Sequence, residues 1–321
     1  MKPHAQASDS IQPPPWGNIP VSIERSHPAG MEKTPKRSNR FVLFVLLGLC
    51  GGGSMAHPSH ASTLMSMTSW TGRFPVVVIA HRGFSGVAPE NTLAAFSKAI
   101  ETGCDMIEMD VQLSRDGEVV VIHDDTLDRT TNGKGKVSQH TLQDLRKFDA
   151  GLWFSPEFTG ERIPALKEAL ALTCGKIPLT IELKKGDLGQ YTIFDLADRA
   201  LAEVEKAGCL GQVVFSSFDR TAIERILKRN SRIPVAYIYN KPWNSPLELR
   251  GEYPIPILNC RQTILTKDNL MKAHQAGLKV NVWTVDTEPE MELFLDLGVD
   301  GIISNHPDRA IQVLKKRQTS N

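Results

Sequence analysis

Apolar segments of the kind that form buried strands alternate with segments of helical periodicity from about residue 70 to the end of the chain. The stretch Pro75-Val-Val-Val-Ile-Ala80 predicts a buried strand, because it is short, apolar and β-branched. The stretch that follows predicts a helix, with Leu93, Phe96 and Ile100 at helical spacing. The same pattern predicts eight strands, which begin at residues 75, 106, 178, 213, 234, 257, 279 and 301. It predicts helices over 91–102, 165–173, 193–207, 220–228, 267–276, 289–297 and 308–316.

Eight strand–helix repeats in about 250 residues are typical of one α/β architecture, the TIM (β/α)8 barrel. A doubly wound open sheet is the alternative, but such a sheet usually contains fewer units. Residues 118–122 are an apolar return segment after the turn Arg115-Asp-Gly117, so we expect an extra hairpin arm there. The polar stretch 124–162 predicts a short inserted loop after the second strand, with one short helix near 142–147.

The first residues of the chain have a different pattern. Residues 41–50 form an unbroken apolar run, preceded by basic residues and followed by small ones up to Ala56. This order predicts a secretory signal, and the run is short for a permanent membrane span. We therefore expect an N-terminal extension and signal over 1–56, a linker over 57–72 and the barrel domain over 73–321. Translation is expected to begin at Met31, and the protein to be exported to the periplasm or secreted; anchoring through residues 41–50 is the alternative.

Composition adds few constraints. The chain has 321 residues, 41% of them hydrophobic, and a formal net charge of +1, which gives no case for nucleic acid or an anionic membrane as partner. None of the five cysteines forms a CxxC pair, which argues against a zinc cluster. Exported proteins can form disulfides. The sequence is compatible with one disulfide among Cys104, Cys174 and Cys209, and equally with free buried thiols.

Polar and aromatic residues gather where the predicted strands end. In a TIM barrel the active site lies at the carboxyl ends of the strands, so residues far apart in sequence meet there. The candidates are His81 and Arg82 after the first strand, Glu108 and Asp110 in the second, His123 at the end of the hairpin arm, Glu182 and Lys184 at the end of the third, and Trp283 in the seventh.

Three of these candidates are acids that suit a metal ion. Glu108 and Asp110 are two positions apart in a strand, so their side chains share one face. Together with Glu182 they offer hard oxygen ligands of the kind that Mg²⁺ or Ca²⁺ prefers. The alternative is a salt-bridge network in which these acids pair with Arg82 and Lys184.

The remaining candidates suit phosphate chemistry. His81 and His123 can act as an acid–base pair, because imidazole titrates near neutral pH. The guanidinium of Arg82 matches two phosphate oxygens, and Lys184 adds a point charge. We expect Trp283 to form an apolar wall for the alcohol part of a substrate.

Two residues between the first strand and the first helix are expected to have supporting roles. Asn91 stands at the start of the predicted helix, so we expect it to be the N-cap. Glu90 is expected to hold Arg82 in place.

Taken together, the motifs resemble the glycerophosphodiester phosphodiesterase family over roughly residues 78–310. The resemblance rests on several segments, each weak alone and specific in combination. They are His81-Arg-Gly83, Pro89-Glu-Asn-Thr92, Glu108-Met-Asp-Val111, Val121-Ile-His-Asp124, Leu127-Asp-Arg-Thr-Thr-Asn-Gly133, Ile181-Glu-Leu-Lys184 and Val282-Trp-Thr-Val285.

The resemblance implies a fold, a cofactor and a reaction. It implies a TIM barrel that holds one divalent cation, Ca²⁺ or Mg²⁺, through Glu108, Asp110 and Glu182. It implies that His81 and His123 are the general acid and base, and that Arg82 and Lys184 contact the phosphate. The implied reaction releases an alcohol and sn-glycerol 3-phosphate from small-molecule glycerophosphodiesters. One departure is Ser304-Asn305 before the last His-Pro pair, where the family often has Thr-Asp.

Two rival functions stay open at the level of sequence. The first is a related phosphodiesterase acting on intact lipid, phospholipase D-like or phosphatidylinositol-specific, for which Pro242-Trp243 is the one hint of an apolar lip. The second is a non-catalytic exported protein that binds phosphodiesters. That protein would need no paired histidines.

Overall fold

The computed structural model describes residues 72–241 and 255–320. The predicted signal and extension, the linker up to residue 71, and Pro242-Trp243 lie outside these described residues. Within the described residues, no helix combines the length and the apolar character needed to cross a membrane.

Eight parallel strands form the closed barrel that the sequence predicts. Each strand pairs with its neighbours in chain order, and β1 pairs with both β2 and β9, which closes the sheet. The hairpin arm β3 runs antiparallel to β2. The strands are β1 (Val77–Ala80), β2 (Met106–Leu113), β3 (Val119–Val121), β4 (Leu179–Leu183), β5 (Val213–Ser217), β6 (Val235–Tyr239), β7 (Ile257–Arg261), β8 (Lys279–Trp283) and β9 (Gly301–Ser304).

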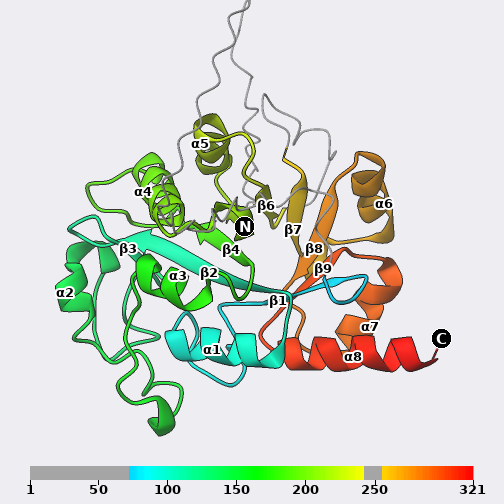
Figure 1. Cartoon of the computed structure of the whole chain (residues 1–321), viewed down its shortest axis with the longest axis horizontal. Coiled ribbons are helices and arrows are strands. Elements are labelled where there is room, and N and C mark those ends of the chain that lie inside the picture. Colours follow the sequence, from blue (N-terminus) through cyan, green and yellow to red (C-terminus); the bar gives the residue numbers. More distant parts are fainter. Residues whose placement is uncertain (1–71, 242–254, 321) are drawn as a thin grey trace, which may run out of the picture. The chain divides into compact units, whose positions relative to one another are not determined.

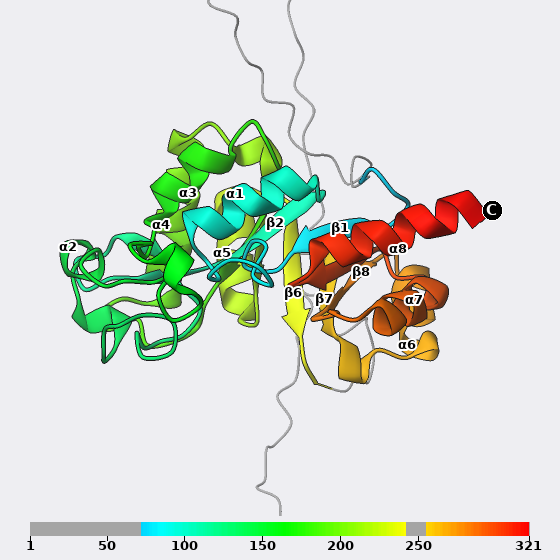
Figure 2. The same ribbon diagram turned by 90° about the horizontal axis from the view of Figure 1, so that it is seen from below.

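Helices follow the strands and cover the outside of the barrel (Figure 1). The first and last helices, α1 and α8, are neighbours, and α8 packs on β1, where the barrel closes (Figure 2). The helices are α1 (Leu93–Thr102), α2 (Leu142–Leu145), α3 (Leu166–Thr173), α4 (Ile193–Lys206), α5 (Arg220–Arg229), α6 (Lys267–Gln275), α7 (Glu288–Leu297) and α8 (Pro307–Ser320). Short 3-10 turns add η2 (Val137–Gln139), η3 (Pro156–Phe158), η4 (Leu210–Gln212) and η6 (Gln262–Ile264).

Alternation along the strands separates the core into two parts. On β2, Ile107, Met109 and Val111 point outward and pack in the main hydrophobic cluster under the helices. Met106 points inward and belongs to a smaller apolar cluster inside the barrel, with Val77, Ile79, Val214, Ala236, Ile257 and Ile303. Many of the inward positions that come later on the strands are polar, including Glu108, Glu182, Ser216 and Asn259, whereas Ile238 and Trp283 add apolar surface there. The barrel therefore has an apolar floor and a polar mouth, as expected for this fold.

The insertion between β3 and α3 has a small core of its own. Val119 and Val121 on β3 pack in the main cluster, whereas Val120 and Ile122 face the insertion. There they pack against Leu127, Val137, Leu142, Leu145, Ala150, Ile163 and Ala165. The predicted short helix is confirmed as α2, but the stretch is a packed lobe rather than a plain loop, because the second apolar face of β3 needs a cover.

The structure contains both a disulfide and free buried thiols, the two alternatives that the sequence left open for the cysteines. Cys174, at the end of α3, and Cys209, before β5, form a disulfide with their Cα atoms 5.9 Å apart. Cys104 and Cys260 are buried free thiols.

Candidate active site

The predicted site residues converge at the mouth of the barrel. A cavity of about 140 Å³ is lined by His81, Arg82, Glu108, His123, Glu182 and Trp283, among others. Asp110 and Lys184 adjoin it, since Lys184 Nζ lies 2.8 Å from Glu182 Oε1 and 3.5 Å from Asp110 Oδ1. The sequence-based prediction that these residues meet is therefore confirmed for their positions.

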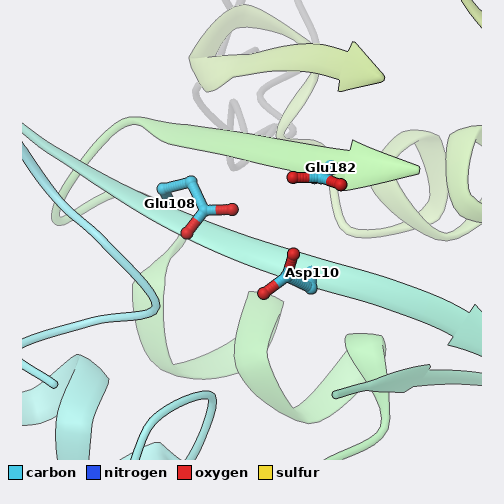
Figure 3. A group of neighbouring side chains, drawn as sticks. All are labelled: Glu108, Asp110 and Glu182. Atoms are coloured by element: carbon cyan, nitrogen blue, oxygen red, sulfur yellow. The ribbon is translucent and has the colours of Figure 1, made fainter. Parts of the chain in front are cut away.

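The three acids form one buried cluster between two neighbouring strands. Glu108 and Asp110 project from β2 and Glu182 projects from β4, with their carboxylates gathered between the strands (Figure 3). The strand register places Asp110 directly opposite Glu182. One carboxylate oxygen from each residue lies within 4.8 Å of the other two. All three side chains belong to buried residues, so the cluster is a concentration of negative charge shielded from water.

Burial and mutual repulsion act unequally on these acids. Burial raises the pKa of Glu108 well above its usual range, and the charges of Asp110 and Glu182 add to the effect. Burial also raises the pKa of Glu182, with Asp110 contributing. Burial acts in the same direction on Asp110, but the charges of Lys184 and Arg82 outweigh it and lower the pKa of Asp110. A divalent cation would relieve this repulsion, and three clustered carboxylate oxygens are the donor set that Ca²⁺ and Mg²⁺ prefer.

Basic residues already pair with the acid cluster, as the alternative prediction held. Arg82 Nε lies 3.4 Å from Asp110 Oδ2, and Lys184 bridges Asp110 and Glu182. The two interpretations are compatible, because two basic side chains cannot neutralise all three carboxylates when these are ionised. Both basic groups also border the inner cavity, since Arg82 lines it and Lys184 contacts its lining residue Glu182.

Arg82 is held by the loop between β1 and α1. Its Nη1 donates to Glu90 Oε1 at 2.7 Å, so the expected role of Glu90 is confirmed. The prediction for Asn91 was wrong: the N-cap of α1 is Thr92, whose side chain accepts from the amide of Ala95. Asn91 instead donates from Nδ2 to Asp110 Oδ2 at 2.8 Å and accepts from the Asp110 amide at 3.2 Å. The amide side chain thus orients a carboxylate of the cluster.

His81 is oriented by a relay from the last strand. Asn305 Nδ2 donates to Asp286 Oδ2 at 2.7 Å, because a carboxylate can only accept. This contact turns Asn305 Oδ1 toward His81 Nδ1, which lies 2.7 Å away. The Nδ1 atom of His81 must therefore carry the proton, which leaves Nε2 with a free lone pair. Burial and the charge of Arg82 lower the pKa of His81 to about 4, so the ring is neutral at physiological pH.

His123 is held by a carboxylate and by the peptide chain around it. Its Nδ1 lies 2.6 Å from Asp124 Oδ1. The pKa of Asp124 is lowered to about 2, first by a hydrogen bond from Arg129, so this residue is a carboxylate. Gln112 Nε2 faces the carbonyl oxygens of Ile122, His123 and Asp124 at 2.8–3.1 Å. This buried amide fixes the bend that carries His123 into the mouth.

A second, more open cavity of about 650 Å³ joins the inner one. The two share His123, Glu182, Phe218 and Ile238. Trp283 lies in the inner cavity, where its ring meets Phe218 edge to face with centroids 5.8 Å apart. The outer cavity is polar and aromatic, with further lining from Asp124, Asp125, Lys184, Lys185, Tyr237, Tyr239, Asn240 and Lys241.

Several functional partners were missed by sequence reasoning. Asp124 and Arg129 stand inside quoted motifs, so their place in the sequence was visible but their partners were not. Asn305, held by Asp286, contacts His81 from 224 positions away. No periodic pattern signals such contacts.

Comparisons with known proteins agree with this geometry. The sequence model of the glycerophosphoryl diester phosphodiesterase family matches residues 81–309. A glycerophosphodiester phosphodiesterase of Caldanaerobacter subterraneus subsp. tengcongensis is 36% identical over 245 residues, which cover 75% of this chain and 98% of that protein. A glycerophosphodiester phosphodiesterase of Bacillus subtilis is 30% identical over 298 residues, which cover 87% of this chain and 99% of that protein.

Solved structures show the same fold. A phosphodiesterase of Oleispira antarctica, in complex with the product sn-glycerol-3-phosphate, is similar with a TM-score of 0.70 and 30% identity. The match covers 76% of this chain and 98% of that one. A glycerophosphodiester phosphodiesterase of Agrobacterium tumefaciens is similar with a TM-score of 0.64 and 28% identity, covering 74% of this chain and 99% of that one.

Proposed function

Because this chain belongs to the glycerophosphoryl diester phosphodiesterase family, we propose that it hydrolyses glycerophosphodiesters to an alcohol and sn-glycerol 3-phosphate, in the breakdown of phospholipids. The observation that carries the proposal is one cavity lined by two histidines, an arginine and members of a buried carboxylate cluster. The Oleispira phosphodiesterase, whose structure contains sn-glycerol-3-phosphate, supports the same substrate class.

One divalent cation, Ca²⁺ or Mg²⁺, is part of the proposal. Glu108, Asp110 and Glu182 would hold it, since each offers a carboxylate oxygen to a common point. When bound, the cation supplies positive charge that stabilises the phosphoryl oxygens of the transition state. Arg82 and Lys184 add the donors that bind and orient the phosphate.

The two histidines have distinct roles in the proposed mechanism. His81 is the general base, because its Nε2 lone pair is free while Asn305 holds the proton on Nδ1. It takes the proton of the attacking hydroxyl, from water or from the neighbouring glycerol, as the new bond to phosphorus forms. Attack by the glycerol hydroxyl gives a cyclic phosphate, which a water molecule then opens to sn-glycerol 3-phosphate. His123 is the general acid, because it lines the same cavity and the Asp124 carboxylate, 2.6 Å from its Nδ1, orients the ring. It gives its proton to the alcohol oxygen as that oxygen leaves phosphorus.

The two cavities divide the substrate. The small inner cavity takes the glycerol part, so its apolar wall Trp283 would contact the glycerol and not the leaving alcohol expected from the sequence. The wider outer cavity takes the alcohol that leaves, and its open shape suits head groups of different size. The phosphate then lies between them, beside the shared residues His123 and Glu182.

Export to the periplasm or to the outside of the cell is also proposed. The predicted signal within residues 1–56 supports it, and so does the disulfide between Cys174 and Cys209, because such bonds persist in oxidising compartments. Anchoring through residues 41–50 is the alternative. Cell fractionation distinguishes a released protein from one that sediments with membranes.

A coupled assay for glycerol 3-phosphate tests the proposed activity. The substrates are glycerophosphocholine and other head-group esters, assayed after EDTA treatment and again after Ca²⁺ or Mg²⁺ is added back. We expect turnover that EDTA abolishes and the cation restores. His81→Ala and His123→Ala are each expected to lower kcat by about 100-fold or more.

His274→Ala is the matched control. His274 also contacts a carboxylate, Asp300, at 2.8 Å, but it lies near the start of β8, at the far end of the barrel. This variant is expected to keep wild-type turnover. Hydrolysis of micellar phospholipid in preference to glycerophosphocholine would favour the lipid-active rival. Binding without turnover would favour the binding protein, and near-wild-type rates in both histidine variants would refute the mechanism.

A further inference from the structure

Arg129 makes contacts that neither the cavity lining nor the proposed chemistry uses. It belongs to the insertion that follows β3, and its guanidinium contacts two carboxylates at once. The Nη1 and Nη2 atoms donate to Glu90 at 2.7 and 2.8 Å. The Nε and Nη2 atoms donate to Asp124 at 2.6 and 3.0 Å. Both edges of the guanidinium are thus occupied by a carboxylate.

Each of those carboxylates has a second partner in the site. Glu90 Oε1 also accepts from Arg82 Nη1 at 2.7 Å. Asp124 Oδ1 also lies 2.6 Å from His123 Nδ1. A continuous chain of charged hydrogen bonds therefore runs from Arg82 through Glu90, Arg129 and Asp124 to His123.

We infer that Arg129 is a positioning residue that aligns the phosphate-binding Arg82 with His123, an inference that rests on the proposed function. The argument is electrostatic and geometric. Glu90 and Asp124 are both bound to one guanidinium, so their negative charges face each other across it. Without the guanidinium the two carboxylates repel, and the side chains that they orient lose their fixed relation.

The chemistry of arginine explains why this position needs that residue. A guanidinium presents donors on two edges in a fixed plane, and each edge matches a carboxylate. A lysine ammonium carries the same charge but cannot engage two carboxylates with paired donors. The side chain of Arg129 is 44% exposed, whereas Glu90 is 13% and Asp124 is 26% exposed. Arg129 therefore lies on the solvent side of Glu90 and Asp124 and connects the two carboxylates there.

Steady-state kinetics of Arg129→Ala and Arg129→Lys test the inference. We expect each variant to lower kcat/KM for glycerophosphocholine, by about 10- to 100-fold for the alanine variant. The loss should include a rise in KM, because a displaced Arg82 binds the phosphate less well. It should also include a fall in kcat, because a displaced His123 protonates the leaving alcohol less well. With a glycerophosphate ester of nitrophenol, whose leaving group needs little protonation, the fall in kcat should shrink while the rise in KM remains. A general loss of structure would affect both substrates alike.

Chemical rescue gives a second readout. The site of Arg129 is open to solvent, so millimolar guanidinium chloride is expected to restore part of the activity of Arg129→Ala and to leave the wild type unchanged. Arg146→Ala is the matched control, because Arg146 is an insertion arginine of similar exposure, 42%, that pairs with Glu168 away from the cavity. It should keep wild-type kinetics and show no rescue.

The outcomes separate the two proposals. A wild-type enzyme without turnover overturns the proposed function itself. If the wild type is active, three results would overturn the role of Arg129. They are unchanged kinetics in Arg129→Ala, equal losses on both substrates, and full activity in Arg129→Lys.

Discussion

Two residues next to the acid cluster have backbone conformations that are uncommon outside glycine. Arg82 has a φ of 56° and Asn91 a φ of 58°, both in the left-handed region. The amide of Arg82 donates to Glu108 Oε2 at 2.8 Å, and the amide of Asn91 donates to the carbonyl of Arg82 at 3.0 Å. Each such residue costs of order 1 kcal/mol, and the cost persists because the surrounding contacts require it. The strained loop thus brings peptide and side-chain donors to the carboxylates of β2.

The orientation of His81 gives a prediction for one residue. Asn305→Ala removes the acceptor that keeps the proton on His81 Nδ1, so the ring loses its fixed tautomer. We expect kcat to fall by about 10- to 100-fold with a smaller change in KM. Asn305→Asp retains an acceptor at this position and is expected to lose less. Kinetics together with circular dichroism measure the effect; an alanine variant with wild-type kcat would show that Asn305 does not set the tautomer.

Residue types and strand ends were enough to predict most of the site. The alternation in β2 placed Glu108 and Asp110 on one face, and the barrel topology added Glu182 from β4. The role of Asn91 was not predictable, because Asn and Thr are both good N-caps and only tertiary contacts decide between them. The relay through Asn305 was equally hidden, since it depends on how closely β9 and β1 approach.

At the scale of elements, the local sequence pattern predicted the strands and helices better than it predicted the contacts between side chains. The observed strands and helices begin and end within a few residues of their predicted bounds, because buried strands and amphipathic helices have distinct periods. The 3-10 turns η2 and η3 were not predicted, since they depend on the packing of the insertion. One signal was available: residues 119–122 are apolar on both faces of the hairpin arm, which indicates that something must cover each face.

Helix α4 contains a carboxylate whose environment gives a prediction about stability. Glu203 is partly buried, and its Oε2 has no hydrogen-bond partner among the described residues. Burial raises its pKa to about 7, although the charge of Lys167 opposes the shift. The folded protein thus holds this proton at pH values where the unfolded chain has lost it. Stability therefore falls as pH rises from about 4.5 to about 7.

Glu203→Gln removes that dependence. At pH 8 the variant should be more stable than the wild type by on the order of 1–2 kcal/mol, after discounting for partial exposure. At pH 5 the difference should nearly vanish. Urea unfolding at both pH values measures it. Glu205→Gln, at an exposed position on the same helix, is the control and should show no such difference between the two pH values. Equal stability of the wild type and Glu203→Gln at pH 8 would contradict the prediction.

At the scale of the whole barrel, the two ends have different tasks. At the amino ends of the strands, aspartates bind the backbone: Asp105 accepts from the amide of Val78 and Asp300 from the amide of Val280, both at 2.9 Å. At the carboxyl ends, like charges are buried together instead. The sequence predicted the closure through the count of eight strands. The exact register, which puts Asp110 opposite Glu182, required the structure.

If the acid cluster holds the proposed cation, the stability of the barrel should depend on that cation. The clustered acids destabilise the folded state, so a cation that binds them should stabilise it. After EDTA treatment, Ca²⁺ or Mg²⁺ at 100 times its Kd should stabilise the fold by about 3 kcal/mol, or raise Tm by about 5–10 °C. Asp110→Asn should lose most of this rise. Asp268→Asn, which changes a surface partner of Lys272, should keep it. Differential scanning calorimetry measures the shift without reference to turnover. If neither ion changes the wild-type Tm at millimolar concentration, the cluster does not hold a cation.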